Sequence, residues 1–279
     1  MSNVNPMTQT DFYKVNHKFQ YPEGTSLVFS GMAPRSGKHF PLPVDGVVFL
    51  GLQKLCMEHL IEDWDNNFFN VDIDTACGFY RRRIETSLGP DAIDFSHVEE
   101  LHKLGYLPVR IRALPEGVIV PFKVPMFTIE NTLPEFFWLT NYLETVISSE
   151  IWKPTTVATI AREYRKILEE YAEKTGAPKE MIPFSVHEFA FRGMSGRHDA
   201  GNSGVGHLAS FVGTDNMPAI DTCERYYFAD AESELIGTSI PATEHSVACA
   251  NIGHIEDELL RAGQYKGQSI EELARILEG

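Results

Sequence analysis

The feature that most limits how this chain can fold is a repeated order of short apolar segment, polar loop and helix that begins near residue 180. Such repeats predict parallel βα units, whose functional residues gather beyond the carboxyl ends of the strands. The predicted units are FSVHEF (184–189) with a glycine-rich loop and a helix near 203–211, FVG (211–213) with TDN and a helix near 217–228, and ELIGTSI (234–240) with PATEH and a helix near 243–262. The polar loops of the three units are therefore expected on one face.

The repeat stops after three units. A closed βα barrel needs eight units over roughly 250 residues, and an open doubly wound sheet usually has five or six strands. Parallel strands with uncovered edges tend to pair with other chains. We therefore expect the chain to be a fragment, one half of a split enzyme or a truncated relative. Its last segment, SIEELARILEG, predicts a helix capped by Ser269 and Glu272.

The residues before position 180 have a different pattern. The expected elements are strands at 25–31 and 47–50, an amphipathic helix at 51–64, a small antiparallel region at 107–131, a buried helix that begins at a capping box of Thr132 and Glu135, and a helix at 155–176 that ends at Gly176. The fold class is therefore α/β. A small α+β N-terminal domain (1–150) is followed by an incomplete βα barrel-like domain (151–279).

Charge excludes some partners. The chain has 39 acidic and 24 basic residues and a net charge of −15, which disfavours nucleic acid as a main partner. An anionic small molecule would need local arginines. The sequence has no apolar run of the roughly 20 residues that a membrane span needs and no signal-peptide pattern at its N-terminus. We expect a cytoplasmic protein without a membrane partner, and its four separated cysteines fit reduced thiols.

Three motifs fail tests of spacing. GMAPRSGKH (31–39) has five residues between its glycines and a histidine after the lysine, so it is not a P-loop. GNSGVG (201–206) does not have its glycines in the order of the dinucleotide-binding motif. Two interpretations remain for it: a flexible turn before a helix, or a backbone cradle for an anion. His187, His198 and His207 lack the partners of a zinc motif, so no metal site is predicted.

Glu244 and His245 follow a predicted strand. A carboxylate beside an imidazole can tune proton or phosphoryl chemistry, which makes the pair a candidate catalytic site. Adjacent residues in an extended segment point apart, which argues against a direct contact between the two side chains.

Six segments together resemble the nicotinamide phosphoribosyltransferase family, which belongs to the type II phosphoribosyltransferases. They are TDFYKVNHKFQYP (10–22), LPEFFWLTNYLET (133–145), WKPTTVATIAREYRKIL (152–168), HEFAFRGMSG (187–196), GTD (213–215) and SIPATEHS (239–246). Their order and spacing are also similar to the family pattern, to about residue 255. The resemblance implies a type II phosphoribosyltransferase-like fold and the transfer of phosphoribose from phosphoribosyl pyrophosphate to nicotinamide.

The resemblance also implies how the pyridine ring is bound. Phe189 would stack on one face of the ring, and Tyr13 of a second subunit would stack on the other, with Asp11 in the same N-terminal segment. Each stacked face contributes roughly 1–3 kcal/mol. Asp215 would accept a hydrogen bond from the carboxamide and repel the carboxylate of nicotinic acid. Such a site requires a homodimer.

The remaining implied roles concern phosphate and catalysis. Arg192 would lie beside the base and phosphate, Ser239 and Ala242 would line the base pocket, and Arg35 would meet pyrophosphate across the dimer. ATP would phosphorylate His245, with Glu244 as an orienting neighbour. Mg²⁺ would draw charge from the leaving pyrophosphate.

The departures from the family pattern leave alternatives open. Ala190 and Gly196 stand where glycine and serine are more usual, and the second half of the family's pattern has no counterpart here. A separate C-terminal half would then be a partner. The alternatives are a nicotinate phosphoribosyltransferase and a non-catalytic truncated paralogue that dimerises.

Overall fold

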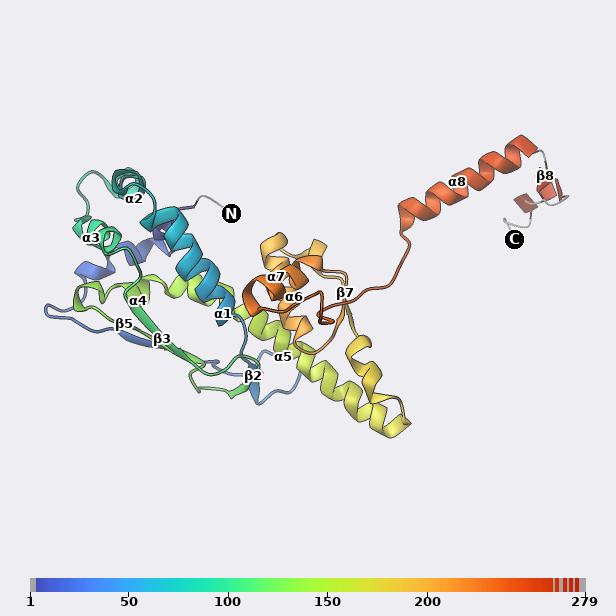
Figure 1. The fold of residues 1–279 in the computed structure, drawn as a ribbon, viewed down its shortest axis with the longest axis horizontal. Coiled ribbons are helices and arrows are strands. Elements are labelled where there is room, and N and C mark those ends of the chain that lie inside the picture. Colours follow the sequence, from blue (N-terminus) through green and yellow to red (C-terminus); the bar gives the residue numbers. More distant parts are fainter. Residues whose placement is uncertain (1–3, 263, 266–267, 270, 273, 276–279) are drawn as a thin grey trace. The chain divides into compact units, whose positions relative to one another are not determined.

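The computed structural model describes residues 4–262, 264–265, 268–269, 271–272 and 274–275 (Figure 1). The chain divides into two units, Met1–Thr238 and Ser239–Gly279. None of the helices among the described residues combines the length and the apolar character that a membrane span requires.

The first unit is mainly helical. Its α-helices are α1 (Leu52–Leu55), α2 (Ile73–Leu88), α3 (Ser96–Leu104), α4 (Leu139–Tyr142), α5 (Glu144–Thr175), α6 (Arg197–Leu208) and α7 (Met217–Tyr227). Short 3₁₀ helices are η1 (Pro6–Thr8), η2 (Phe12–Phe19), η5 (Pro134–Phe136), η6 (Lys179–Phe184) and η7 (Phe191–Gly193), and the π-helical segments are η3 (Cys56–Glu62) and η4 (Asp65–Phe69). The predicted helix at 51–64 is therefore confirmed, with π-helical turns that its periodicity did not indicate.

Antiparallel strands form in the regions predicted for them. β1 (Phe29–Met32), β5 (Phe127–Asn131) and β3 (Val109–Ala113) make a three-stranded sheet in that order. β2 (Gly46–Val48) pairs with β4 (Ile119–Pro121). Alternate side chains of β5 are buried, which places one face of the sheet against the core.

A large apolar core joins this sheet to the surrounding helices. It includes the fully buried Trp64, Phe68, Tyr80 and Leu139, and it extends to Ile151 in α5. Helix α5 passes through residues 150 and 151 without a break. The predicted domain boundary at that point stays a prediction.

Two expectations about this region were wrong. The residue before η5 is Leu133, and no side chain caps that helix, so the capping box of Thr132 and Glu135 does not form. The helix expected after Thr132 and Glu135 and the helix expected at 155–176 are not divided as predicted, because α5 begins at Glu144 and continues through Pro154 to Thr175. Threonines of α5 also hold the chain after β2: Thr155 Oγ1 donates to Leu50 O at 2.9 Å. The predicted end at Gly176 is confirmed, with φ of 73°.

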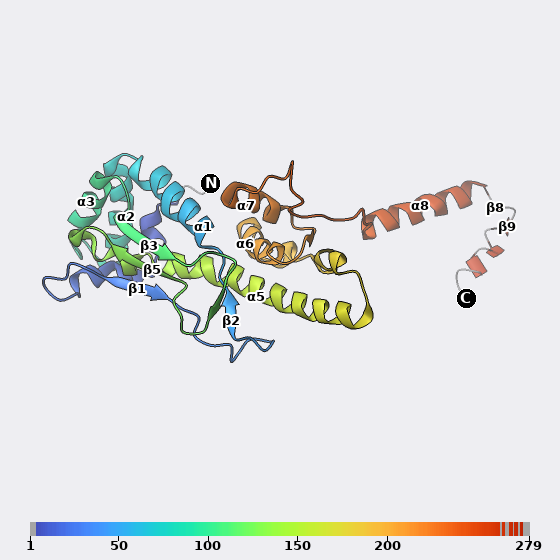
Figure 2. The same cartoon turned by 60° about the horizontal axis from the view of Figure 1, so that its bottom comes forward.

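The first two predicted parallel units are present, whereas the third predicted strand, at 234–240, is reduced to a single bridge. β6 (His187–Glu188) pairs with β7 (Gly213–Thr214) in parallel, and Thr238 forms a parallel bridge to Gly213. Helices α6 and α7 follow β6 and β7, and α6 packs against both α5 and α7 (Figures 1 and 2). The carboxyl ends of the strands therefore meet at one edge, as expected.

The segment GNSGVG (201–206) is neither a turn nor an anion cradle, which corrects both interpretations. It lies inside α6, which begins at Arg197, and its residues are buried. A Cβ atom on Gly204 would lie far inside van der Waals contact of Ala219 Cβ, and one on Gly206 would lie 2.8 Å from Pro154 O. These glycines let three helices approach closely.

The second unit contains α8 (His245–Ala262), β8 (Gln264–Tyr265) and β9 (Gln268–Ser269). Helix α8 was predicted near 243–262. The capping box of Ser269 and Glu272 is confirmed, because Ser269 N donates to Glu272 Oε2 at 3.0 Å and Glu272 N donates to Ser269 Oγ at 3.3 Å. Several residues of the predicted terminal helix lie outside the described residues.

Candidate substrate pocket

A pocket of about 740 Å³ opens beside the carboxyl ends of β6 and β7. It is lined by Phe189, Phe191, Arg192, Met194, Gly196 and Asp215. Three residues that the sequence assigned to the base site, Phe189, Arg192 and Asp215, thus lie together. The side chain of Phe189 is 67% exposed, so a ring face is accessible to a flat ligand.

Asp215 is oriented by a neighbouring strand. His187 Nε2 lies 2.8 Å from Asp215 Oδ1, and Asp215 N donates to Glu188 O at 3.0 Å. The His187 and Phe189 rings are 4.6 Å apart and tilted by 34°. The histidine therefore contacts both the carboxylate and the aromatic side chain.

Glu188 was not assigned a role from the sequence. Its Oε1 accepts from Ala190 N at 2.7 Å, and its Oε2 accepts from Thr214 Oγ1 at 3.0 Å. This carboxylate joins the turn after Phe189 to the next parallel strand. No local pattern indicates the role, because Thr214 is 26 positions away in the sequence.

The N-terminal segment that carries Tyr13 is held by hydrogen bonds of the residues on both sides of it. Thr145 Oγ1 donates to Asp11 Oδ2 at 2.7 Å, and Lys14 Nζ donates to Asn141 O at 2.8 Å. Tyr13 itself is 63% exposed, on η2. The structure therefore does not bring Tyr13 or Asp11 to the Phe189 pocket of the same chain, whose lining includes neither.

Arg35 lines a different pocket, of about 710 Å³, together with Lys123, Asn141 and Glu144. Two cationic side chains in this pocket are suited to an anionic group. The Arg35 pocket and the Phe189 pocket share no lining residue. Arg35, the residue predicted to contact pyrophosphate, therefore does not line the base pocket of the same chain.

The last four predicted site residues, Ser239, Ala242, Glu244 and His245, belong to the second unit. His245 is the first residue of α8 and is exposed. Ser246 Oγ donates to Glu244 Oε1. Glu244 thus has a hydrogen bond to the helix that follows it, next to the candidate phosphoryl acceptor.

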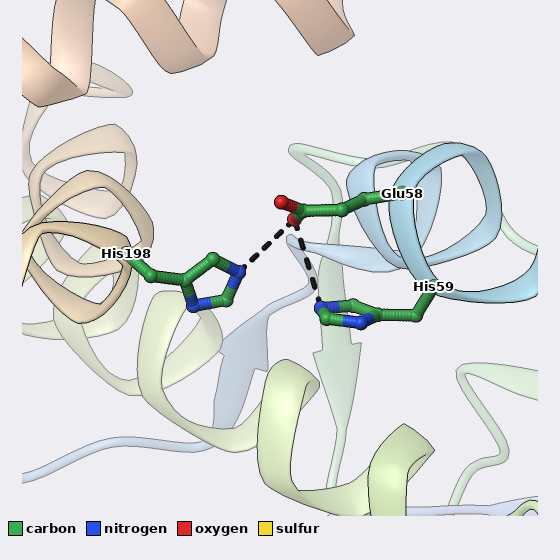
Figure 3. Close-up of side chains that lie close together, drawn as sticks. All are labelled: Glu58, His59 and His198. Atoms are coloured by element: carbon green, nitrogen blue, oxygen red, sulfur yellow. Dashed lines mark hydrogen bonds and ion pairs between the residues drawn. The ribbon is translucent and has the colours of Figure 1, made fainter. Parts of the chain in front are cut away.

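The three histidines of the glycine-rich segment have three separate environments. His187 meets Asp215, the buried His207 contributes Nε2 at 2.8 Å from Gly213 O, and His198 lies 3.0 Å from Glu58 Oε2. Burial lowers the pKa of His207. Glu58, His59 and His198 form a cluster that the sequence did not indicate (Figure 3).

The fold has a counterpart among solved structures. The crystal structure of human nicotinic acid phosphoribosyltransferase superposes with a TM-score of 0.57, at 20% identity, over 86% of this chain and 40% of that one. The fold class is therefore that of the type II phosphoribosyltransferases, as predicted, with the α+β region followed by βα units.

Sequence comparisons identify the family. Residues 5–111 match the model for the N-terminal domain of nicotinamide phosphoribosyltransferase, and residues 184–271 match that of the nicotinate phosphoribosyltransferase family. A nicotinamide phosphoribosyltransferase of Acinetobacter baylyi is 51% identical over 92% of this chain and 50% of its own length. One of Xanthomonas campestris pv. campestris is 34% identical over 87% of this chain and 48% of its own length. The chain belongs to the nicotinamide phosphoribosyltransferase family, and it spans about half the length of these curated relatives.

Proposed function

We propose that this chain belongs to a nicotinamide phosphoribosyltransferase that joins nicotinamide to phosphoribosyl pyrophosphate and releases pyrophosphate. One observation carries the proposal: an exposed aromatic face, Phe189, lies beside a carboxylate, Asp215, that is held in place by His187. The relatives named for this activity support it. Four free cysteines fit the reducing cytoplasm as its location.

The carboxylate would decide between the amide and the acid. An ionised Asp215 accepts a hydrogen bond from the carboxamide N–H of nicotinamide, and it repels the carboxylate of nicotinic acid. His187 holds this carboxylate toward the pocket edge, which limits the entropy lost on binding. Nicotinate transfer, the activity named for the human structural relative, is disfavoured by the same charge.

The reaction itself is a displacement at the anomeric carbon of ribose. The pyridine nitrogen forms the new C–N bond while the bond from ribose to pyrophosphate breaks, through an oxocarbenium-like state. The role of the chain is to orient the ring, with Phe189 against its face and Arg192 toward the phosphate side. No proton transfer to a protein group is required at the ring nitrogen.

Mg²⁺ and ATP are included in the proposal. Mg²⁺ uses oxygen ligands, commonly one or two carboxylates together with substrate phosphates. The carboxylate that lines the Phe189 pocket, Asp215, is assigned to the carboxamide, so pyrophosphate oxygens and water would hold most of the ion's coordination. Bound Mg²⁺ would stabilise the leaving charge. ATP would phosphorylate His245, which is exposed at the first turn of α8.

A homodimer with shared sites is also proposed. Tyr13 and Phe189 are both largely exposed, and the hydrogen bonds of Asp11 and Lys14 present Tyr13 outward from its own unit. A partner's Tyr13 would close the second face of the ring. Mixing Tyr13→Ala chains with Phe189→Ala chains tests this, because each mixed dimer would regain one intact nicotinamide site. Absence of any recovery in verified mixed dimers would contradict sharing.

The activity is tested by formation of nicotinamide mononucleotide. The 279-residue chain is assayed alone and together with a C-terminal half taken from a relative. We expect turnover in the combined preparation, and turnover in neither would count against the proposal. A chain that dimerises but binds no nicotinamide, with or without Phe189→Ala, would instead be a non-catalytic paralogue.

Specificity is tested by competition between nicotinamide and nicotinic acid. Asp215→Ser is expected to lose the preference for the amide, whereas Asp74→Ser, on α2 and outside the pocket, keeps it. A variant that still rejects the acid as strongly as the unmodified chain would refute the role of this carboxylate.

A further inference from the structure

A cluster of imidazole and carboxylate groups lies away from the Phe189 pocket, where η3, α5 and α6 meet. Glu58 and His59 come from η3, and His198 comes from α6 (Figure 3). One ligand atom from each lies within 4.8 Å of the other two. Among the described residues, this is the group of histidine, cysteine and acidic side chains close enough to share one metal ion.

The distances resemble those between ligands of a tetrahedral ion. Glu58 Oε2 is 3.0 Å from His198 Nε2 and 3.6 Å from His59 Nε2. With Zn–N and Zn–O bonds of about 2.0–2.2 Å, neighbouring ligand atoms are about 3.3–3.6 Å apart. A carboxylate oxygen of a fourth side chain, Glu150 Oε2, lies 3.5 Å from His59 Nε2 and 3.9 Å from His198 Nε2.

His59 is positioned as metal-binding histidines usually are. Its Nδ1 lies 3.0 Å from Asp63 Oδ2, and a carboxylate on one ring nitrogen orients the other toward a metal. The Nε2 atom is buried and lies 3.5 Å from Glu150 Oε2 and 3.6 Å from Glu58 Oε2, so it faces both carboxylates. The same ring atom is therefore directed toward the position that a metal ion would occupy.

The helix geometry explains how two consecutive residues reach one point. Bonding from residue i to i+5 widens a helix, so successive side chains diverge by a smaller angle than in an α-helix. Glu58 and His59 lie in such a π-helical segment, Cys56–Glu62. π-helical turns occur often at functional sites.

The surroundings favour a divalent cation. The cluster lies in the wall of a pocket of about 680 Å³, which gives an ion access from solvent. Five carboxylates and three cationic side chains line this pocket, a net charge of −2 before the histidines are counted; they are Glu58, Glu62, Asp63, Glu150 and Asp221, and Lys54, Arg197 and Arg225. Glu150 Oε2 faces both imidazoles of the cluster, so it can serve as a further oxygen ligand.

The ammonium group of Lys54 would compete with a metal ion for the centre of this cluster. Its Nζ lies 3.0 Å from His198 Nε2 and 3.8 Å from Glu150 Oε2, and it also contacts Glu58. The same ammonium lies 5.5 Å from the ring centroid of Tyr226, an alternative location for its charge. An incoming ion would displace the ammonium from the cluster.

We propose that Glu58, His59 and His198 bind a divalent transition-metal ion, with Zn²⁺ as the ion that fits best. Glu150 is the fourth ligand, and Asp63 supports His59. The site shares no lining residue with the Phe189 pocket. It connects segments that are 140 positions apart in the sequence, so its ion stabilises the contact between η3 and α6.

The test uses the whole chain, stripped of metal with a chelator and titrated with Zn²⁺ by calorimetry. We expect saturable binding of one ion per chain, a rise in Tm, and with Co²⁺ the visible absorption of a tetrahedral site. Glu58→Gln and His198→Gln should abolish that binding, and Asp63→Asn should weaken it by about 10–100-fold. Lys54→Met should strengthen it, since the competing charge is gone.

The matched control is His254→Gln, an exposed histidine of α8 outside the cluster, which should bind Zn²⁺ like the unmodified chain. Far-UV circular dichroism confirms that each variant is folded. The proposal is overturned if the folded chain shows no saturable Zn²⁺ binding, or if Glu58→Gln and His198→Gln leave the binding unchanged. Either result would make the cluster an ion-pair network centred on Lys54.

Discussion

Replacement of Gly204 by alanine tests why the centre of α6 is rich in glycine. The added Cβ would overlap Ala219 Cβ and lie 2.7 Å from Asn216 Nδ2. Asn216 is fully buried, and its Nδ2 donates to Ala200 O at 2.8 Å, so it has little freedom to move. The substitution therefore forces apart two helices that pack closely at this point.

The magnitude follows from two opposing effects. Alanine is favoured over glycine inside a helix by about 1 kcal/mol, whereas overpacking a close contact costs about 1–3 kcal/mol. The overlap involves two buried neighbours and threatens a buried hydrogen bond, so the cost is at the upper end. We expect Gly204→Ala to lower the free energy of unfolding by about 2 kcal/mol.

The assay is urea unfolding followed by circular dichroism, with the midpoint and slope fitted for each variant. Gly78→Ala is the matched control, because Gly78 is also inside a helix, α2, and a Cβ there meets nothing within 4 Å. It should raise the free energy of unfolding by about 0.5–1 kcal/mol. If both variants were stabilised equally, close helix packing would not be the reason for Gly204.

Two further predictions concern a buried histidine, His97, and a glycine with positive φ, Gly51. Burial and the charge of Lys18 lower the pKa of His97 to about 4, below the unfolded value near 6.5. The stability that neutral His97 contributes is therefore fully present above pH 6.5 and is lost as the pH falls toward 4. The unmodified chain should lose about 2–3 kcal/mol more than His97→Phe between pH 7 and 4.5 in urea titrations, and equal losses would contradict this. Gly51 has φ of 110°, and a Cβ there would lie 2.7 Å from Pro154 Cγ, so Gly51→Ala should cost about 2–3 kcal/mol. Gly105→Ala, with φ of 78° and open space around it, should cost about 1 kcal/mol by thermal unfolding, and a larger loss there than at Gly51 would refute the packing argument.

Much of the fold was predictable from local patterns. The end of α5 at Gly176, the parallel order of β6 and β7 and the positions of α7 and α8 all follow from periodicity and turn residues. Such elements depend on neighbours within a few positions, which the sequence displays directly. The gathering of Phe189, Arg192 and Asp215 in one pocket was also expected, because loops after parallel strands lie at one edge.

The failures all involve partners distant in the sequence. Thr132 and Glu135 have the spacing of a capping box, yet Thr132 N donates to Pro108 O at 2.7 Å, and Leu133 precedes η5 without a side-chain cap. The glycines of 201–206 look like a loop because glycine is usually found in turns. Their place in α6 follows from the close approach of Ala219 and Pro154, which no local pattern displays.

The sequence by itself determined the helical and extended segments, because these follow from short-range order and spacing, and its resemblance to the nicotinamide phosphoribosyltransferase family indicated the side chains expected to bind a pyridine ring. Tertiary structure alone decided that buried glycines join α5, α6 and α7, and that His198 meets Glu58 and His59. The physical reason is that these contacts depend on how helices pack, and packing is set by the shapes of surfaces formed from residues far apart in the chain.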